Sequence, residues 1–308
     1  MRALLVVNPK ATATSARVRD VLIRALGSDL KLDVAETEHR GHAVLLAEQA
    51  ALDGFGMVVA LGGDGTVNEV VNGVMRLPDG EARPAVAVVP GGSANVFNRL
   101  LGQPTDPVEA TSALLEALRA GRRRTISLGR ANERYFAFCA GIGIDAEVVA
   151  LVEQHRAAGA IATPALYARA ALRHYFLGTE RRHGRVRVEL PDEPALDGLA
   201  MAIVCNTAPW TYCGSRPLNP CPDASFDTAL DLFALRKLRT FSTVRALVHM
   251  ASTNPAGPRG RQVVRRHDLA ELTVTASTPL ALQLDGDYCG EHDRVVLGDV
   301  PAALTVVG

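Results

Sequence analysis

The sequence predicts an α/β domain with a mainly parallel sheet, followed by a mostly antiparallel β-sandwich domain. The chain has 308 residues, which suggests two domains of about 150 residues each. Short apolar runs alternate with segments of helical spacing up to residue 120, whereas strand patterns dominate after residue 185. We assign residues 1–123 to the first domain and 124–308 to the second, and the segment after about residue 290 is a candidate to return to the first. A ligand is expected in the cleft between the domains.

The elements of the first domain follow one another in a regular order. Gly27 is expected to end the first helix, and Pro107 suits the first turn of the last one. Strands that alternate with helices of this length form right-handed βαβ units and hence a parallel sheet. Predicted strands cover residues 2–7, 32–37, 56–63 and 84–92, and predicted helices cover 16–26, 42–54, 66–75, 94–102 and 106–120.

The second domain begins with two short strands around the turn 130–133. Helical spacing follows at 145–158 and 164–177, where few charges occur, so this region is a candidate acyl pocket or bilayer contact as well as ordinary core. The basic group Arg181, Arg182, His183 and Arg185 is either a solvated loop or a contact for anionic headgroups. Predicted strands cover 185–190, 199–206, 229–235, 270–276, 280–286, 293–298 and 303–308, with one helix at 241–252.

The composition excludes several classes of protein. Lys plus Arg and Asp plus Glu both number 33, so no global field attracts nucleic acid. The five cysteines are odd in number and form no Cys-x-x-Cys pair, which argues against a disulfide framework or a zinc site and favours a cytoplasmic protein. No apolar run approaches the roughly 20 residues that span a bilayer, and the first apolar run is read as a strand. We expect a soluble chain that at most touches the inner membrane face.

The stretch GGDGT at residues 62–66 lies between a buried strand and a helical face formed by Val67, Val70, Val71 and Val74. Thr66 and Glu69 have the spacing of a capping box, which predicts a helix start at Thr66. Glycines allow positive φ and let a ligand approach backbone amides, and a helix start attracts phosphate. The stretch therefore predicts a phosphate-binding turn, although a plain strand-to-helix turn remains an alternative.

Asp64 distinguishes this turn from a dinucleotide-binding loop. A carboxylate beside phosphates is unfavourable unless it meets a cation or takes a proton, which points to phosphoryl transfer with Mg²⁺. A second turn, Pro90 to Ser93, has the same design and predicts a helix that begins by Ala94. Two glycine-lined helix starts on one sheet favour the binding interpretation.

These residues together resemble the diacylglycerol kinase catalytic domain shared by soluble bacterial lipid kinases, sphingosine kinases and ceramide kinases. The similar segments are, in order, VVNPKAT, TEHRGHAVLLAEQA, LGGDGTVNEVVNG, VVPGGSANVFNRLLG, AGIGIDAEVV and LQLDGDYCG. GGDGT-x-NEVVNG is the most specific of them. The resemblance implies a two-domain fold with an interdomain active site, ATP and Mg²⁺.

The resemblance also implies roles for individual residues. Asp287 stands in place of the family's general base, Asp64 lies near the metal or shares that duty, and which of the two accepts the proton stays open. Asp145 and Asn95 are expected on the lipid side, and Glu69 is either a ribose contact or a helix cap. The implied nucleotide contacts are Asn8, Thr37, Gly62, Gly63, Asp64, Gly65, Thr66, Asn68, Glu69, Gly91, Gly92, Ser93 and Asp285.

Three positions depart from the family pattern. Val96 stands where many relatives have an acid, and Asp287 replaces a glutamate, so the base is one methylene shorter. The segment 222–230 matches a structural magnesium loop only loosely, with Asp227 as its best counterpart and Thr228 in place of glycine.

The predicted activity is transfer of the ATP γ-phosphoryl group to a lipid hydroxyl, with diacylglycerol as the first candidate acceptor and phosphatidic acid as the product. A sphingoid base, a ceramide or another lipid alcohol is an alternative acceptor. NAD kinase and a catalytically inactive nucleotide- or lipid-binding protein are alternative functions. The expected partners are ATP, the lipid and a membrane surface, without nucleic acid, and a homodimer is left open.

Overall fold

The computed structural model describes the whole chain except residues 12–14, 79, 158–183, 253 and 255. The chain divides into two compact units. The first comprises Met1–Ile126 and Ala302–Gly308, and the second comprises Ser127–Pro301. The predicted helix at 164–177 and the basic residues 181–183 lie outside the described residues.

The first unit contains a parallel sheet whose strand order is β2-β1-β3-β4, with the end of β16 beside β4. Each pair of neighbouring strands is parallel, as the alternating pattern predicted. The strands are β1 (Arg2–Val7), β2 (Lys31–Glu36), β3 (Met57–Gly62), β4 (Ala85–Pro90) and β16 (Asp287–Val307).

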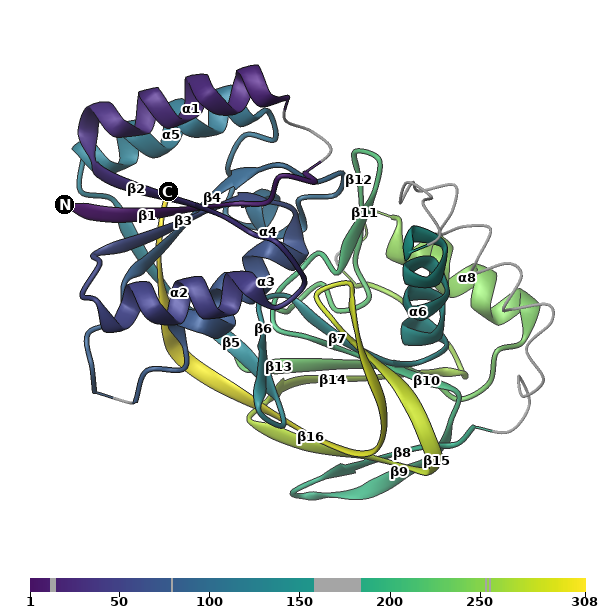
Figure 1. Cartoon of the computed structure of the whole chain (residues 1–308). Coiled ribbons are helices and arrows are strands. Elements are labelled where there is room, and N and C mark those ends of the chain that lie inside the picture. The colour runs from purple at the N-terminus through teal and green to yellow at the C-terminus, as the bar shows by residue number, and fades with distance from the viewer. Residues whose placement is uncertain (12–14, 79, 158–183, 253, 255) are drawn as a thin grey trace. The chain divides into compact units, whose positions relative to one another are not determined.

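Helices cover both faces of this sheet, α1 and α5 on one and α2 and α3 on the other (Figure 1). On the first face, Leu22 and Leu26 of α1 and Leu114 of α5 share a core with the strands. On the second, Gly73 of α3 lets α2 approach, because a Cβ there would lie 2.8 Å from the Ala47 Cβ. The helices are α1 (Ala16–Asp29), α2 (His42–Leu52), α3 (Asp64–Val74), α4 (Val96–Leu100) and α5 (Pro107–Arg119).

The expected end of the first helix at Gly27 is wrong, because α1 continues to Asp29. Leu22, Leu26 and Leu30 are buried at intervals of four residues, so the apolar face extends past the glycine. A glycine inside a helix costs about 1 kcal/mol relative to alanine, less than the burial of one leucine contributes.

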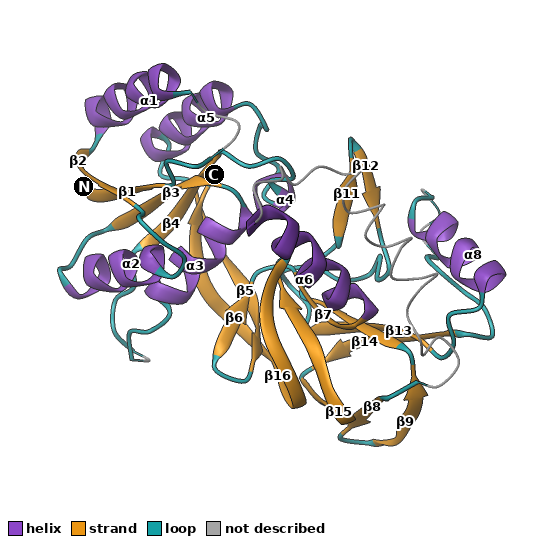
Figure 2. Ribbon diagram, turned by 45° about the vertical axis from the view of Figure 1, so that its right-hand side comes forward, coloured by secondary structure: helices purple, strands orange, loops and turns teal. Residues whose placement is uncertain are grey.

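The second unit is mostly antiparallel, which together with the first unit confirms the predicted fold class. Its strands run in the order β14-β13-β10-β7-β15-β16, while β8 pairs with β15 and β9 (Figure 2). In the described part of this unit, the helices α6 (Ile144–Ala157) and α8 (Thr240–Met250) accompany the sheet. The strands are β5 (Arg123–Ala131), β6 (Arg134–Phe136), β7 (Cys139–Gly143), β8 (Val186–Leu190), β9 (Glu193–Leu199), β10 (Met201–Cys205), β11 (Thr211–Cys213), β12 (Arg216–Leu218), β13 (Leu230–Leu235), β14 (Val263–Leu269) and β15 (Glu271–Leu284).

Strand β14 was not predicted, because Arg265 and Arg266 interrupt its apolar pattern. Both arginines pair with carboxylates, Arg265 with Asp223 and Arg266 with Glu193. All five cysteines are free thiols. Among the described residues, no helix has the length and apolarity that crossing a bilayer would require.

Candidate nucleotide and lipid sites

The carboxyl ends of β1 and β3 meet where the sheet order reverses, since the chain adds β2 on one side of β1 and β3 on the other. Open α/β sheets bind ligands at this point. Asn8 follows β1, and its amide Nδ2 donates to the Thr66 hydroxyl of α3 over 3.1 Å. Its Oδ1 accepts from the Lys10 amide, and the Thr37 amide after β2 donates to the Val7 carbonyl. The sheet therefore brings Asn8 and Thr66 together and holds Thr37 at the end of the neighbouring strand.

The two glycine turns pack directly on each other. A Cβ on Gly92 would lie 2.7 Å from the Gly63 Cα, and one on Gly91 would lie 3.1 Å from the Gly62 Cα. The Gly91 amide donates to the Gly62 carbonyl over 2.8 Å. None of these four glycines has a positive φ. Glycine is required because the turns leave no room for a side chain.

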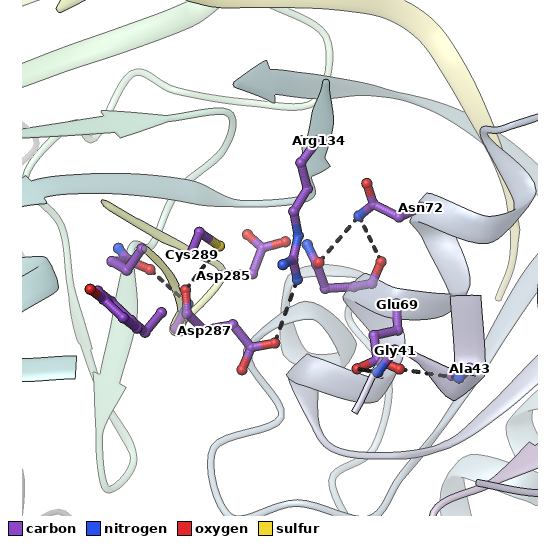
Figure 3. Close-up of polar contacts among 12 residues, drawn as sticks. Gly41, Ala43, Glu69, Asn72, Arg134, Asp285, Asp287 and Cys289 are labelled. Carbon is purple, nitrogen blue, oxygen red and sulfur yellow. Dashed lines mark hydrogen bonds and ion pairs between the residues drawn. The ribbon is translucent and has the colours of Figure 1, made fainter. Parts of the chain in front are cut away.

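The predicted capping box at the start of α3 is also wrong. The helix begins at Asp64, with Gly63 as its N-cap and no side-chain cap. Both Glu69 oxygens serve the start of α2 instead, where they accept from the amides of Gly41 at 2.8 Å and Ala43 at 3.1 Å (Figure 3). Glu69 is thus a cap, as one of its two predicted roles required, but for a helix 26 to 28 residues away. A ribose contact by Glu69 stays a prediction.

Asp64 caps the second glycine turn. Its Oδ2 accepts from the Val96 amide and its Oδ1 from the Phe97 amide, both at 3.0 Å. The helix α4 therefore begins at Val96 rather than by Ala94, and its first amides are bound to protein. The Val96 side chain is buried, so an acid at this position would lose its water.

Asn95 completes the same turn. It adopts a left-handed φ of 47° as the N-cap of α4. Its Oδ1 accepts from the Gly92 amide at 2.9 Å and its Nδ2 donates to the Gly92 carbonyl at 2.8 Å. Asn95 thus closes the loop around Ser93, whose side chain is exposed. Phosphate binding by amides in this region is best supported at the start of α3, where first-turn amides lack intrahelical partners.

Asn68 is buried in α3, and its Oδ1 and carbonyl accept from the Asn72 amide at 3.2 and 2.8 Å (Figure 3). This position favours a structural role for Asn68. Its predicted nucleotide contact has no support in these contacts.

In the second unit, the segment DGDY forms the hairpin between β15 and β16. Leu284 pairs with Asp287, and the two residues between them have φ of 51° (Asp285) and 81° (Gly286). Two positive φ angles in a two-residue loop are typical of a type I′ turn, which suits Asp-Gly. The Asp285 carboxylate is buried and accepts from three amides, those of Ala137 at 2.6 Å, Phe138 at 2.9 Å and Cys139 at 3.1 Å.

The hairpin fixes Asp287, the predicted base. Its Oδ2 lies 3.7 Å from Arg134 Nη2, an ion pair that the sequence did not indicate (Figure 3). The Asp287 carbonyl accepts from the Cys289 thiol at 3.3 Å, and the Tyr288 amide donates to Glu153 of α6 at 3.2 Å. Arg134 is therefore a candidate positioning residue for Asp287.

Asp145, the predicted lipid-side acid, lies in the first turn of α6 and accepts from the Gln283 side-chain amide at 2.9 Å. Desolvation raises the pKa of Asp145 to about 6, while the Gln283 hydrogen bond opposes the shift. A Cβ on Gly141 would overlap the Asp145 carboxylate, so glycine is required there. Gln283 also accepts from the Gly286 amide at 2.8 Å and thereby connects Asp145 to the hairpin of Asp287. The one signal for Gln283 was a lone polar residue in the apolar run LALQL.

The predicted magnesium loop has no support among the described residues, which include no cluster of three or more His, Cys, Asp or Glu suited to a metal. The Asp227 amide donates to the Ser225 hydroxyl at 3.2 Å in a local turn. The metal role of Asp227 stays a prediction.

Residues 2–131 match the family model of the diacylglycerol kinase catalytic domain. A diacylglycerol kinase of Staphylococcus saprophyticus is 25% identical over 292 residues, which cover 94% of this chain and 90% of that protein. The "Probable lipid kinase YegS-like" protein of Chromohalobacter salexigens is 38% identical over 144 residues, which cover 47% of this chain and 44% of that protein.

Solved structures have the same fold. A crystal structure of a diacylglycerol kinase from Bacillus anthracis matches with a TM-score of 0.76 and 22% identity, over 99% of this chain and 96% of that one. The ordered motifs, the family model and the full-length relative agree, and they confirm the resemblance noted in the sequence. Residues 2–131 carry the catalytic-domain signature of the diacylglycerol kinases, and the chain as a whole is similar to diacylglycerol kinases and lipid kinases.

Proposed function

We propose that the chain transfers the γ-phosphoryl group of ATP to the hydroxyl of diacylglycerol and so forms phosphatidic acid. The observation that carries this proposal is the polar cluster at the switch point of the first sheet, where Asn8 contacts Thr66 at the start of α3. A helix start there offers amides and a partial positive charge to phosphate oxygens. The family implies ATP as the phosphoryl donor.

The proposed reaction would use Mg²⁺, and Asp64 is the residue proposed to hold it. The amides of Val96 and Phe97 fix the Asp64 carboxylate, which holds its negative charge at the glycine turn where phosphate is proposed to bind. Mg²⁺ is usually held by one or two carboxylates together with substrate phosphates, which matches a single nearby acid. When bound, the ion neutralises phosphate charge. We propose Asp64 as the residue of this chain that would hold it.

We assign the proton acceptor to Asp287. Its pairing with Arg134 orients the carboxylate, and its place beside a type I′ turn gives the side chain a defined direction. Asp64, whose oxygens already accept amides, is less suited to take the proton from the lipid. Asp145 and Gln283 would orient the hairpin and the acceptor hydroxyl. The lipid acceptor also implies peripheral contact with a membrane, at the cytoplasmic face.

The test is incubation of the protein with ATP, Mg²⁺ and one acceptor at a time, read by mass spectrometry of the product. The panel holds diacylglycerol, a sphingoid base, a ceramide and NAD. We expect phosphatidic acid as the main product, and loss of product in Asp287→Asn but not in the exposed control Asp293→Asn. A sphingoid-base or ceramide product would correct the acceptor, and an NAD product would replace the function. ATP binding without any product would favour an inactive binding protein.

A further inference from the structure

Helix α8 has an exposed apolar stripe on the second unit. Its residues recur at helical spacing on one side of the helix, while Ala246 and Met250 on the other side are buried in a core with β10 and β13. Figure 2 shows α8 as a separate rod beside the strands of this unit. The exposed fractions of the stripe residues are 83% for Phe241, 54% for Val244, 49% for Leu247 and 61% for Val248.

The surroundings of this stripe are strongly basic. Residues 232–267 contain eight Lys and Arg and no Asp or Glu. Arg265 and Arg266 are neutralised by Asp223 and Glu193 from outside the segment. Six cations have no ion pair with the described residues and are exposed: Arg236, Lys237, Arg239, Arg245, Arg259 and Arg261.

We propose that α8 is a membrane-docking helix that inserts its apolar stripe between anionic lipid headgroups. A helix with an apolar face and flanking cations is the pattern of interfacial helices, which combine buried apolar area with attraction to anionic lipid. A second copy of the chain is a poorer occupant. A two-fold contact through α8 would bring the same uncompensated cations of both copies together.

The docking proposal rests on the proposed function in one respect, which is that a lipid acceptor would be reached at a membrane surface. The binding test is independent of activity. Full-length protein is sedimented with phosphatidylcholine vesicles, with and without 30% phosphatidylglycerol. We expect binding to the anionic vesicles, and weaker binding at high salt because surface charges are screened.

Two pairs of substitutions separate the apolar and the basic contributions. Phe241→Ser with Val248→Ser should weaken vesicle binding about tenfold or more, because burial of these side chains is lost. Lys237→Glu with Arg239→Glu should weaken it more than about twentyfold, since each cation contributes about fivefold. The matched controls on the first unit, Val21→Ser with Leu52→Ser and Arg24→Glu with Lys31→Glu, should bind as the wild type does.

The activity arm uses a short-chain diacylglycerol below its critical micelle concentration. The α8 variants should keep wild-type turnover on this dispersed acceptor and lose it on vesicles. Absence of kinase activity with intact vesicle binding would refute the function and leave the docking proposal standing. Absence of wild-type vesicle binding, or equal binding by variants and wild type, would refute the docking proposal. A wild-type dimer that Phe241→Ser with Val248→Ser converts to a monomer, without change in vesicle binding, would assign the stripe to a contact between copies.

Discussion

The glycine turns of the first unit and the hairpin of the second both have a carboxylate that accepts backbone amides. They differ in why glycine is needed. In the first, Gly63 and Gly92 have ordinary φ and are needed for close contact between two backbones. In the second, Asp285 and Gly286 are needed for positive φ. In each turn one carboxylate, that of Asp64 or Asp285, binds backbone amides from a distant segment.

An acid in a glycine-containing turn can therefore fix backbone amides as well as take part in a reaction. Asp285 accepts three amides and is buried, which gives it an anchoring role, and its nucleotide contact stays a prediction. Asp64 accepts from the amides of Val96 and Phe97 and lies at the proposed phosphate turn, so an anchoring role and a chemical role are both proposed for it. Asp287, which follows the second turn, pairs with a side chain and is the better candidate for chemistry.

The largest expected effect is at Asp285. Asp285→Ala leaves three amides without their acceptor and should lower the free energy of unfolding by about 3–5 kcal/mol. Urea denaturation measures this loss, with the exposed Asp293→Ala as a control that should change little. A loss below 1 kcal/mol at position 285, by the same measurement, would show that the hairpin does not depend on this anchor.

Asp145 should make stability depend on pH. Its pKa is about 6 in the folded state and 3.8 ordinarily, so the folded state binds the extra proton between these values. Stability is then fully present below about pH 4 and is lost as the pH rises through 6, by up to about 3 kcal/mol at 1.4 kcal/mol per pKa unit. Asp145→Asn should remove this loss, whereas Asp192→Asn at an exposed site should not.

Urea unfolding at pH 4.5 and pH 7 checks the prediction. The difference between the two pH values should be smaller in Asp145→Asn than in the wild type. An equal difference in both proteins would mean that Asp145 is not desolvated in the folded state, and its link through Gln283 to the hairpin would lose its expected strength.

The sequence predicted the strands of the first sheet closely, because β1, β3 and β4 are largely continuous apolar runs; β2 mixes charged and apolar residues and was predicted from its place between two helices. The predicted starts of α3 and α4 were wrong. Glu69, which was expected to cap α3, caps α2 instead, and Asp64 caps α4; these contacts join residues 26 to 33 positions apart. The spacing of residues within one segment cannot predict contacts between segments that are far apart in the sequence. The same reason hid Arg134 and Gln283, whose partners Asp287 and Asp145 lie far along the chain.

Asp64 and Asp106 are two helix-capping aspartates, of which only Asp64 lies at the proposed site. Their substitution has the smallest expected loss of stability. Both cap a helix through two amides, Asp64 on α4 and Asp106 on α5. Each change to alanine should lower the free energy of unfolding by about 1–2 kcal/mol. Asp64→Ala should in addition lower the kinase turnover at least about 100-fold, because a charge beside the phosphates is lost, while Asp106→Ala should leave turnover unchanged.

Thermal unfolding and turnover are measured on both variants at a temperature where each is folded. An equal loss of stability with unequal turnover assigns chemistry to Asp64 beyond its cap. If Asp64→Asn keeps wild-type turnover, the carboxylate charge has no catalytic role and Asp64 joins Asp285 as an anchor. The glycine turn would then bind phosphate through its backbone, and Asp287 would be the acid on which transfer depends.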